Sequence, residues 1–155
     1  MKGKRCCKGF TLIELVVTLS IIAVLSCIVV PFSFGAVMKN ELKTAARMIA
    51  SDIRYGENKA LTEQYSSYKI TFVPTSNEYR KYFDKKNINN YERVEMPPRI
   101  KMSSAVFGTE QKLYFNSKGS VLVGGSVTLT DGRGNWAFVR VTPVTGRVRI
   151  EYTEE

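Results

Sequence analysis

The chain has 155 residues, of which 23 are basic, 14 are acidic and none is histidine, so its formal net charge is +9. This length fits one domain with a short additional segment, and the charge favours anionic partners without identifying one. The lack of histidine removes the commonest general base and the commonest zinc ligand. No cysteine follows Cys27, so the bulk of the chain contains no internal disulfide.

A basic segment, residues 1–9, opens the chain and ends at Gly9, and a long apolar run follows it. Leu15 to Met38 contains no charged residue. As a helix, this run would be about 36 Å long, compared with about 30 Å for the hydrocarbon core of a bilayer. The length favours a membrane-spanning helix over a buried helix of a soluble domain. A cleaved signal peptide is the second alternative, but residues 31–36 match its small-residue cleavage pattern poorly.

Glu14 is the only acidic residue in this apolar segment. A carboxylate in a membrane-spanning helix is energetically costly, so its presence indicates a function. The alternative is that Glu14 lies at headgroup depth, where the dipole of the helix N-terminus favours an acid.

The sequence KGFTLIEL, residues 8–15, followed by an apolar run with Pro31, resembles the processing signature of type IV prepilins and type II secretion pseudopilins. The resemblance implies that a prepilin peptidase cleaves after Gly9 and methylates the new N-terminal residue, Phe10. It also implies that Glu14 pairs with the N-terminal ammonium of a neighbouring subunit and sets the register of a filament. Pro31 is expected to kink the helix, either at a site that bends on assembly or as an ordinary membrane-helix kink.

The implied ion pair is strong enough to influence assembly. At a separation of about 4 Å and an effective dielectric constant near 20, two opposite charges gain about 4 kcal/mol. An acid in the middle of a membrane costs about 2.5–3.5 kcal/mol. Glu14 is therefore tolerated near the interface in a single subunit and is stabilised further in a filament.

The helix is expected to continue beyond the membrane as an amphipathic segment. Small and apolar residues recur at spacings of three and four, at Leu42, Ala46, Ile49, Ile53, Gly56 and Ala60. The sequence thus divides into a basic prepilin leader (1–9), a transmembrane helix half (10–38), an amphipathic helix half (39–65) and a C-terminal β-sheet domain (66–155).

The C-terminal part alternates in the pattern of short strands. Strands are expected at residues 68–73, 79–83, 99–102, 112–115, 121–123, 126–130, 136–142 and 147–152. Residues 75–98 are polar and are interpreted as a variable loop around the second of these strands, and glycine-containing turns lie at 131–135 and 143–146. The expected fold is α+β: a long N-terminal helix, membrane-spanning in its first half, packed on an antiparallel β-sheet in a pilin-like arrangement.

Residues 113–119, 126–129 and 146–149 resemble the GspH/FimT type of minor pseudopilin or minor pilin. This resemblance implies a minor subunit near the tip of a short periplasmic filament, with the prepilin peptidase, other pseudopilins or pilins and the inner membrane as partners. The chain would cross the inner membrane once, with a cytoplasmic N-terminus before processing, on the side of its basic leader, and an extracytoplasmic C-terminal domain.

No metal, cofactor or small-molecule substrate is expected. Major pseudopilins often bind calcium in a C-terminal loop, but Asp131 stands alone in its turn, whereas calcium takes about six to eight oxygen ligands. The sequence contains no phosphate-binding GxxxxGK or GxGxxG motif, and its serines have no histidine to activate them. The chain is therefore predicted not to be an enzyme.

The last hairpin is predicted to carry an arginine-rich face. If Val144 and Thr145 form its tip, then Arg140 lies directly opposite Arg149. The same face carries Trp136, Phe138 and Arg147. Two arginines that face one another repel, and beside aromatic rings they suit an anion such as a nucleic-acid backbone.

The GRxR element at residues 146–149 resembles a DNA-contacting tip in the FimT branch, where it serves DNA uptake. The alternative is a solvated face whose charge is partly neutralised by Glu151. Two functions are therefore expected: a minor pseudopilin with a structural role in secretion, or a minor pilin that holds DNA through Arg140, Arg147 and Arg149. A plain membrane-anchored domain is the third interpretation, and it would lose Gly9 and Glu14 without consequence.

Overall fold

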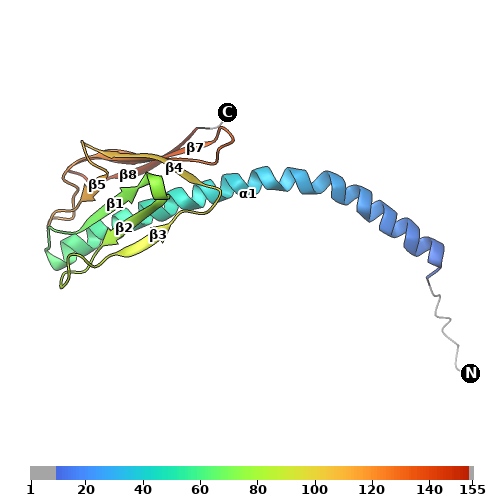
Figure 1. Cartoon of the computed structure of the whole chain (residues 1–155), viewed down its shortest axis with the longest axis horizontal. Coiled ribbons are helices and arrows are strands. Elements are labelled where there is room, and N and C mark those ends of the chain that lie inside the picture. Colours follow the sequence, from blue (N-terminus) through green and yellow to red (C-terminus); the bar gives the residue numbers. More distant parts are fainter. Residues whose placement is uncertain (1–9, 154–155) are drawn as a thin grey trace, which may run out of the picture. The chain divides into compact units, whose positions relative to one another are not determined.

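The computed structural model of the chain describes residues 10–153, and for residues 27–34 it describes the backbone alone. The chain divides into two compact units, one up to Val37 and one from Met38 onward. Helix α1, Leu12–Glu63, contributes to both units (Figure 1). Within the part of the chain that is described, no helix is both long enough and apolar enough to cross a membrane.

The described residues of the second unit form two antiparallel sheets of four strands each. The first sheet has the order β3-β2-β1-β5, with β1 at Lys69–Val73, β2 at Glu78–Tyr82, β3 at Glu92–Glu95 and β5 at Lys112–Tyr114. The second has the order β4-β6-β7-β8, with β4 at Lys101–Phe107, β6 at Gly125–Thr130, β7 at Trp136–Val141 and β8 at Val148–Thr153. A short 3-10 helix, η1 at Pro74–Ser76, connects β1 to β2.

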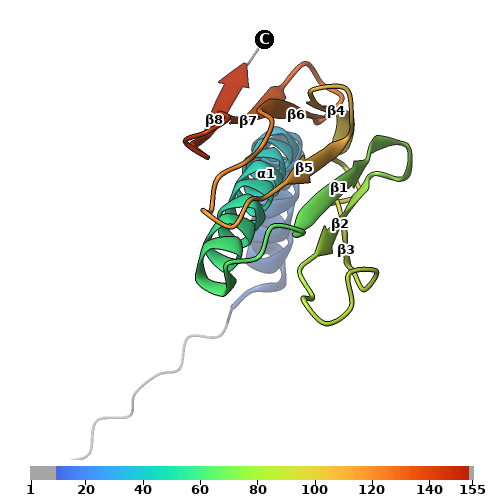
Figure 2. The same cartoon turned by 90° about the vertical axis from the view of Figure 1, so that its left-hand side faces the viewer.

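The C-terminal half of α1 packs against both sheets. Figure 2 shows β8, β7, β6 and β4 along one side of this part of the helix and β5, β1, β2 and β3 along another. The residues of the predicted stripe are all buried: Leu42, Ala46, Ile49, Ile53, Gly56 and Ala60. The predicted amphipathic helix is therefore confirmed, and its spacing explains how one helix can serve the core of two sheets.

Gly56 makes room for two aromatic rings within this stripe. A Cβ atom at this position would lie 2.7 Å from Phe115 Cζ and 2.8 Å from Phe83 Cζ. Glycine in a helix interior costs roughly 0.5–1 kcal/mol relative to alanine. Here the missing side chain allows both rings to pack directly on the backbone of α1.

Phe72 and Asn77 both connect the first sheet to the second. The ring of Phe72 in β1 stacks on Phe107 in β4, with ring centroids 5.3 Å apart. Asn77, in the left-handed conformation at φ 53°, donates from Nδ2 to the carbonyl of Ile100 at 2.7 Å and accepts from the backbone N–H of Met102 at 2.7 Å. This side chain therefore ties the β1–β2 connection to the start of β4.

The predicted α+β class, with a helix packed on antiparallel strands, is confirmed, but the described strands form two sheets and not the one that was expected. β4 and β5 are neighbours in sequence, yet β5 pairs with β1 and β4 pairs with β6. Gly108, at φ 62°, lies in the turn that separates them. Apolar alternation identifies the buried face of each strand but not its partner, so it could not distinguish one sheet from two.

Three strand assignments also differ from the prediction. The strand expected at 99–102 is β4, which begins at Lys101 and continues to Phe107. β3 falls inside the expected loop because it is a polar edge strand, whose Glu92 pairs with Lys81 of β2 at 3.0 Å instead of packing in the core. The expected strand at 121–123 is reduced to one β-bridge at Val121, and the two residues after it are exposed. Apolar character at these two positions therefore did not indicate a strand.

Candidate functional site

The N-terminus of α1 is capped by Thr11. Its Oγ1 accepts a hydrogen bond from the backbone N–H of Glu14 at 3.3 Å, and its carbonyl accepts one from Leu15 at 3.2 Å. Threonine followed three residues later by glutamate is the spacing of a capping box. The cap, together with an acid in the first turn, stabilises a helix that begins two residues after Phe10. The sequence contained this signal, although the capping role of Thr11 was not predicted from it.

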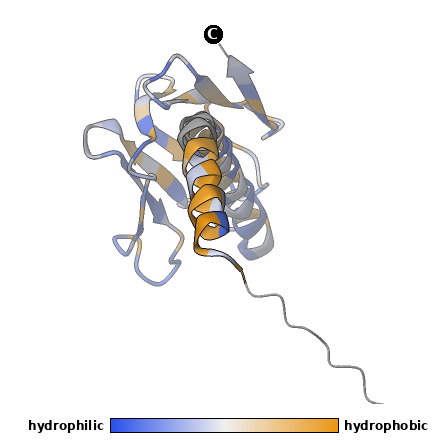
Figure 3. Cartoon of the chain, turned by 90° about the vertical axis from the view of Figure 1, so that its right-hand side faces the viewer, coloured by the Kyte–Doolittle hydropathy of each residue, from blue (hydrophilic) through white to orange (hydrophobic). Residues whose placement is uncertain are grey.

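The first unit exposes apolar side chains around the whole helix. Those at least 48 % exposed between residues 12 and 26 are Leu12, Ile13, Leu15, Val16, Val17, Leu19, Ile21, Ile22, Val24 and Leu25. Figure 3 shows this part of α1 as predominantly hydrophobic. The hydroxyl groups of Thr18, Ser20 and Ser26 bond to carbonyl oxygens of the helix itself. Apolar surface of this extent indicates contact with another protein or a membrane.

Glu14 is the one ionisable residue between positions 12 and 26. It is exposed, and its carboxylate makes no hydrogen bond or ion pair with the described residues. Phe10, four positions earlier, is 80 % exposed. The carboxylate is therefore available to a charge from outside this part of the chain.

Two other predicted site residues are described less fully. Gly9, the expected cleavage position, lies outside the described residues. The backbone of α1 is helical through Pro31, and the kink expected there stays a prediction.

The last hairpin has the predicted register. Arg140 in β7 lies opposite Arg149 in β8, flanked by the pairs Val139–Ile150 and Val141–Val148. The same row continues across the sheet to Ser126 in β6 and Val106 in β4. Both arginines are exposed, so they lie on the outer face of the second sheet.

The three arginines differ in their ion-pair partners. Arg140 Nε lies 3.0 Å from Glu151 Oε2, and both side chains are about half exposed. The side chains of Arg147 and Arg149 make no ion pair with any described residue. This face therefore carries two unpaired guanidinium groups beside one that is partly neutralised.

α1 supports this hairpin through Arg54 and Glu57, which the sequence analysis did not identify. An Nη of Arg54 donates to the carbonyl of Val148 at 3.4 Å. The Glu57 carboxyl packs against Gly146, where a Cβ atom would lie 2.6 Å from Oε1, and that oxygen has no hydrogen-bond partner among the described residues. Glu57 follows the buried Ile53 by four residues, so helical spacing was a signal for its partial burial.

Burial raises the pKa of Glu57 to about 7, although the nearby Arg54 guanidinium acts in the opposite direction. The reason is that a carboxylate loses hydration when it is half buried, and here no hydrogen bond compensates one of its oxygens. Glu57 is therefore a group that can change its charge near neutral pH directly beneath the arginine hairpin.

Asp131, the residue considered for calcium, caps its own turn. Its Oδ1 accepts from the backbone N–H groups of Arg133 at 2.8 Å and Asn135 at 3.2 Å, and its Oδ2 accepts from Asn135 Nδ2 at 2.6 Å. Burial opposes the charged form, but these hydrogen bonds outweigh it and hold the pKa of Asp131 below its usual value. Among the described residues, no group of three or more histidine, cysteine, aspartate or glutamate side chains is placed to hold a metal ion.

Comparison with known families identifies the N-terminal motif. Residues 4–29 match the family model of the prokaryotic N-terminal methylation motif. The match supports a type IV pilin-like or pseudopilin subunit with a membrane-anchored N-terminus, and it implies processing by a prepilin peptidase and assembly with other pilins. No curated protein and no solved structure matches the chain.

Replacement of Glu57 by Gln is expected to stabilise the fold at pH 8 but not near pH 4. The folded state binds the proton of Glu57 more tightly than the unfolded chain, whose pKa is 4.5, so stability falls as pH rises from about 4.5 to about 7. Gln cannot ionise and avoids this loss. We expect its melting temperature at pH 8 to be higher by about 2–4 °C, corresponding to roughly 1 kcal/mol after allowance for partial exposure. Near-UV circular dichroism follows the melting.

The matched control is Glu63→Gln on the same helix. The Tyr68 hydroxyl, which donates to Glu63, is the main cause that lowers the pKa of Glu63. The ionised Glu63 carboxylate therefore contributes to the free energy of unfolding above its unfolded pKa, and this contribution is lost as pH falls. Glu63→Gln removes it, so this variant should be less stable than the unchanged chain at pH 8. Two results would contradict the burial of an uncompensated carboxylate at Glu57. One is a lower melting temperature of Glu57→Gln than of the unchanged chain at pH 8, and the other is an equal increase in melting temperature at pH 4 and pH 8.

Proposed function

We propose that this chain is a minor pseudopilin of a type II secretion system or of a related type IV pilus-like filament, with a structural role in filament assembly. The observation that carries this proposal is Glu14, an exposed carboxylate inside the matched methylation motif and the one ionisable residue between positions 12 and 26 of α1. The minor rather than major assignment is supported by the resemblance of residues 113–119 and 146–149 to the GspH/FimT type.

Processing would create the partner that Glu14 lacks. Cleavage after Gly9 frees an ammonium group on Phe10, four residues before Glu14 and two residues before the start of α1. In a filament, the carboxylate of one subunit meets the ammonium of the next, while the exposed apolar side chains of both helices pack together. The ion pair fixes the axial register, since apolar packing alone is not directional.

The same apolar segment would hold the unassembled subunit in the inner membrane. The basic leader then lies on the cytoplasmic side before processing, and the unit that begins at Met38 lies outside the cytoplasm. Among the described residues, every side chain of the buried hydrophobic core lies between Leu42 and Val148. The second unit thus carries its own core and does not need the N-terminal segment to complete it.

Replacement of Glu14 by Ala tests the assembly role. Alanine keeps helix propensity and removes the charge, so the variant should insert normally but join filaments poorly. Since an ion pair of this kind is worth about 4 kcal/mol, we expect crosslinking to neighbouring pilins to fall at least roughly tenfold. The measurement is site-specific crosslinking between helices in cells that carry the complete assembly system.

Glu41→Ala is the matched control. Glu41 is an acid farther along α1 and already has a partner, Arg99, at 3.5 Å. This variant should assemble as the unchanged chain does. Equal crosslinking of the Glu14 variant and the unchanged chain would show that the carboxylate has no registry role.

A second candidate function is DNA binding by the outer face of the last hairpin. The observation in its favour is that Arg147 and Arg149 are exposed and have no acidic partner among the described residues. Arg140 stands opposite Arg149 but shares its charge with Glu151. Two full phosphate contacts, with a weaker third, are therefore the most that this face offers.

Salt titration of duplex DNA with the fragment 38–155 tests this candidate. Two phosphate contacts would give a log–log slope of about −1.8, at about −0.9 for each contact. Replacing Arg147 and Arg149 by Gln should flatten the slope almost completely without unfolding, because both side chains point away from the core.

Arg133→Gln is the control, since Arg133 is also exposed but lies in the turn between β6 and β7, at the end of β7 opposite the last hairpin's turn. It should leave most of the slope intact. Absence of binding at low salt, or an equal effect of Arg133→Gln, would rule out a specific role of the hairpin.

A further inference from the structure

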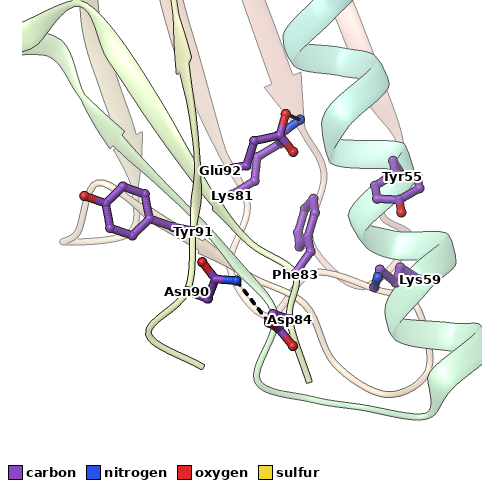
Figure 4. Close-up of a pocket in the computed structure, with 8 residues that line it drawn as sticks. All are labelled: Tyr55, Lys59, Lys81, Phe83, Asp84, Asn90, Tyr91 and Glu92. Carbon is purple, nitrogen blue, oxygen red and sulfur yellow. Dashed lines mark hydrogen bonds and ion pairs between the residues drawn. The ribbon is translucent and has the colours of Figure 1, made fainter. Parts of the chain in front are cut away.

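A cleft of about 450 Å³ lies between the last turns of α1 and the segment that connects β2 to β3 (Figure 4). Its volume is in the range of small-molecule sites, about 300–1,000 Å³. It lies in the second unit, and neither the methylation motif nor the arginine hairpin contributes to it.

The inner wall of the cleft is aromatic and fixed in place. Figure 4 shows Phe83 standing between Tyr55 on α1 and the polar residues of β2 and β3. The Phe83 ring is held by Tyr55, Tyr68 and Phe115, with centroid distances of 5.7, 5.9 and 6.0 Å. Because Gly56 lets this ring approach α1 closely, the wall does not depend on a ligand for its shape.

The polar groups of the cleft are also held in place. Lys81 Nζ lies between Asp52 Oδ1 at 3.4 Å and Glu92 Oε1 at 3.0 Å. Asn90 Nδ2 donates to Asp84 Oδ2 at 3.1 Å, the bond dashed in Figure 4. Groups that are already positioned lose little conformational entropy when a ligand binds.

The charges of the lining cancel. Lys59 and Lys81 supply two positive charges, and Asp84 and Glu92 supply two negative ones. A simple anion would meet the carboxylates and a simple cation would meet the ammonium groups, so the lining selects neither.

The mixture of donors and acceptors matches a different class of ligand. An ammonium group only donates hydrogen bonds, an ionised carboxylate only accepts them, and the amide of Asn90 does both. A hydroxyl group both donates and accepts, so a neutral molecule with several hydroxyl groups can satisfy all three kinds of partner. An aromatic wall adds a requirement for one apolar face, because aromatic side chains contribute mainly through the large apolar surface that they bury.

We propose that this cleft binds a neutral sugar ring, either as a free monosaccharide or as one unit of a glycan. The apolar face of the ring packs on Phe83 and Tyr55, and its hydroxyl groups bond to Glu92 and Asn90. The cleft is open to solvent, so a ring that belongs to a longer chain also fits. This proposal does not depend on the filament role of the N-terminal segment.

The test is ligand-observed NMR on the full chain, purified in a zwitterionic detergent without a sugar headgroup. Glucose, galactose and N-acetylglucosamine are offered at millimolar concentration, first as monosaccharides and then as short oligosaccharides. Saturation transfer to at least one of these sugars is expected. Tighter binding of the oligosaccharide would assign a glycan unit, and equal affinity would assign a free sugar; both results support the site.

Tyr55→Ala should weaken binding roughly tenfold or more, and because Tyr55 is 55 % exposed the core should remain intact. Asn90→Ala, in an exposed loop, should weaken it as well. Tyr152→Ala, a partly exposed tyrosine outside the cleft, is the matched control and should bind as the unchanged chain does. The proposal is overturned if no sugar binds, if Tyr55→Ala and Tyr152→Ala bind equally, or if photo-crosslinking from position 55 places a neighbouring pilin in the cleft.

Discussion

Burial of one stripe of α1, from Leu42 to Ala60, is the contact on which the second unit depends. Full burial of a leucine or isoleucine contributes about 1.5–3 kcal/mol, and this stripe meets the inner faces of both sheets. The position of each residue on the helix then determines its surroundings. Gly56 lies in the stripe and admits the rings of Phe83 and Phe115, whereas Glu57 lies beside the stripe and reaches the last hairpin.

In the first unit, by contrast, the described apolar side chains of the helix are not buried. Its apolar side chains surround the helix, and between residues 12 and 26 they are exposed. Such a segment gains its stabilisation from contacts outside the unit, in a membrane or with other subunits. In the proposed filament, Glu14 would restrict these contacts, because one charge in an apolar surface favours arrangements that bring an opposite charge to it. The division of the chain at Val37 therefore separates a unit with its own core from a unit whose described apolar side chains between residues 12 and 26 are exposed.

The sequence predicted those features whose cause lies in neighbouring residues. Helical spacing revealed the stripe, alternation revealed most strands, and the turn at 143–146 was enough to place Arg140 opposite Arg149. The methylation motif is contiguous, so its recognition required no fold. The division into two sheets and the polar strand β3 depend on pairing between distant segments, which local patterns do not encode. The cleft was missed for the same reason, because it joins Tyr55 and Lys59 of α1 to residues 81–92.

We propose that Phe10 is the N-terminal residue of the mature chain and that its ammonium group pairs with the Glu14 carboxylate of another subunit. The intact mass of the chain, extracted from membranes of cells with an active prepilin peptidase, tests this most directly. The account predicts the loss of residues 1–9 and the addition of one methyl group, located by fragmentation on the nitrogen of Phe10. A chain that keeps Met1 through Gly9 in such cells would contradict it.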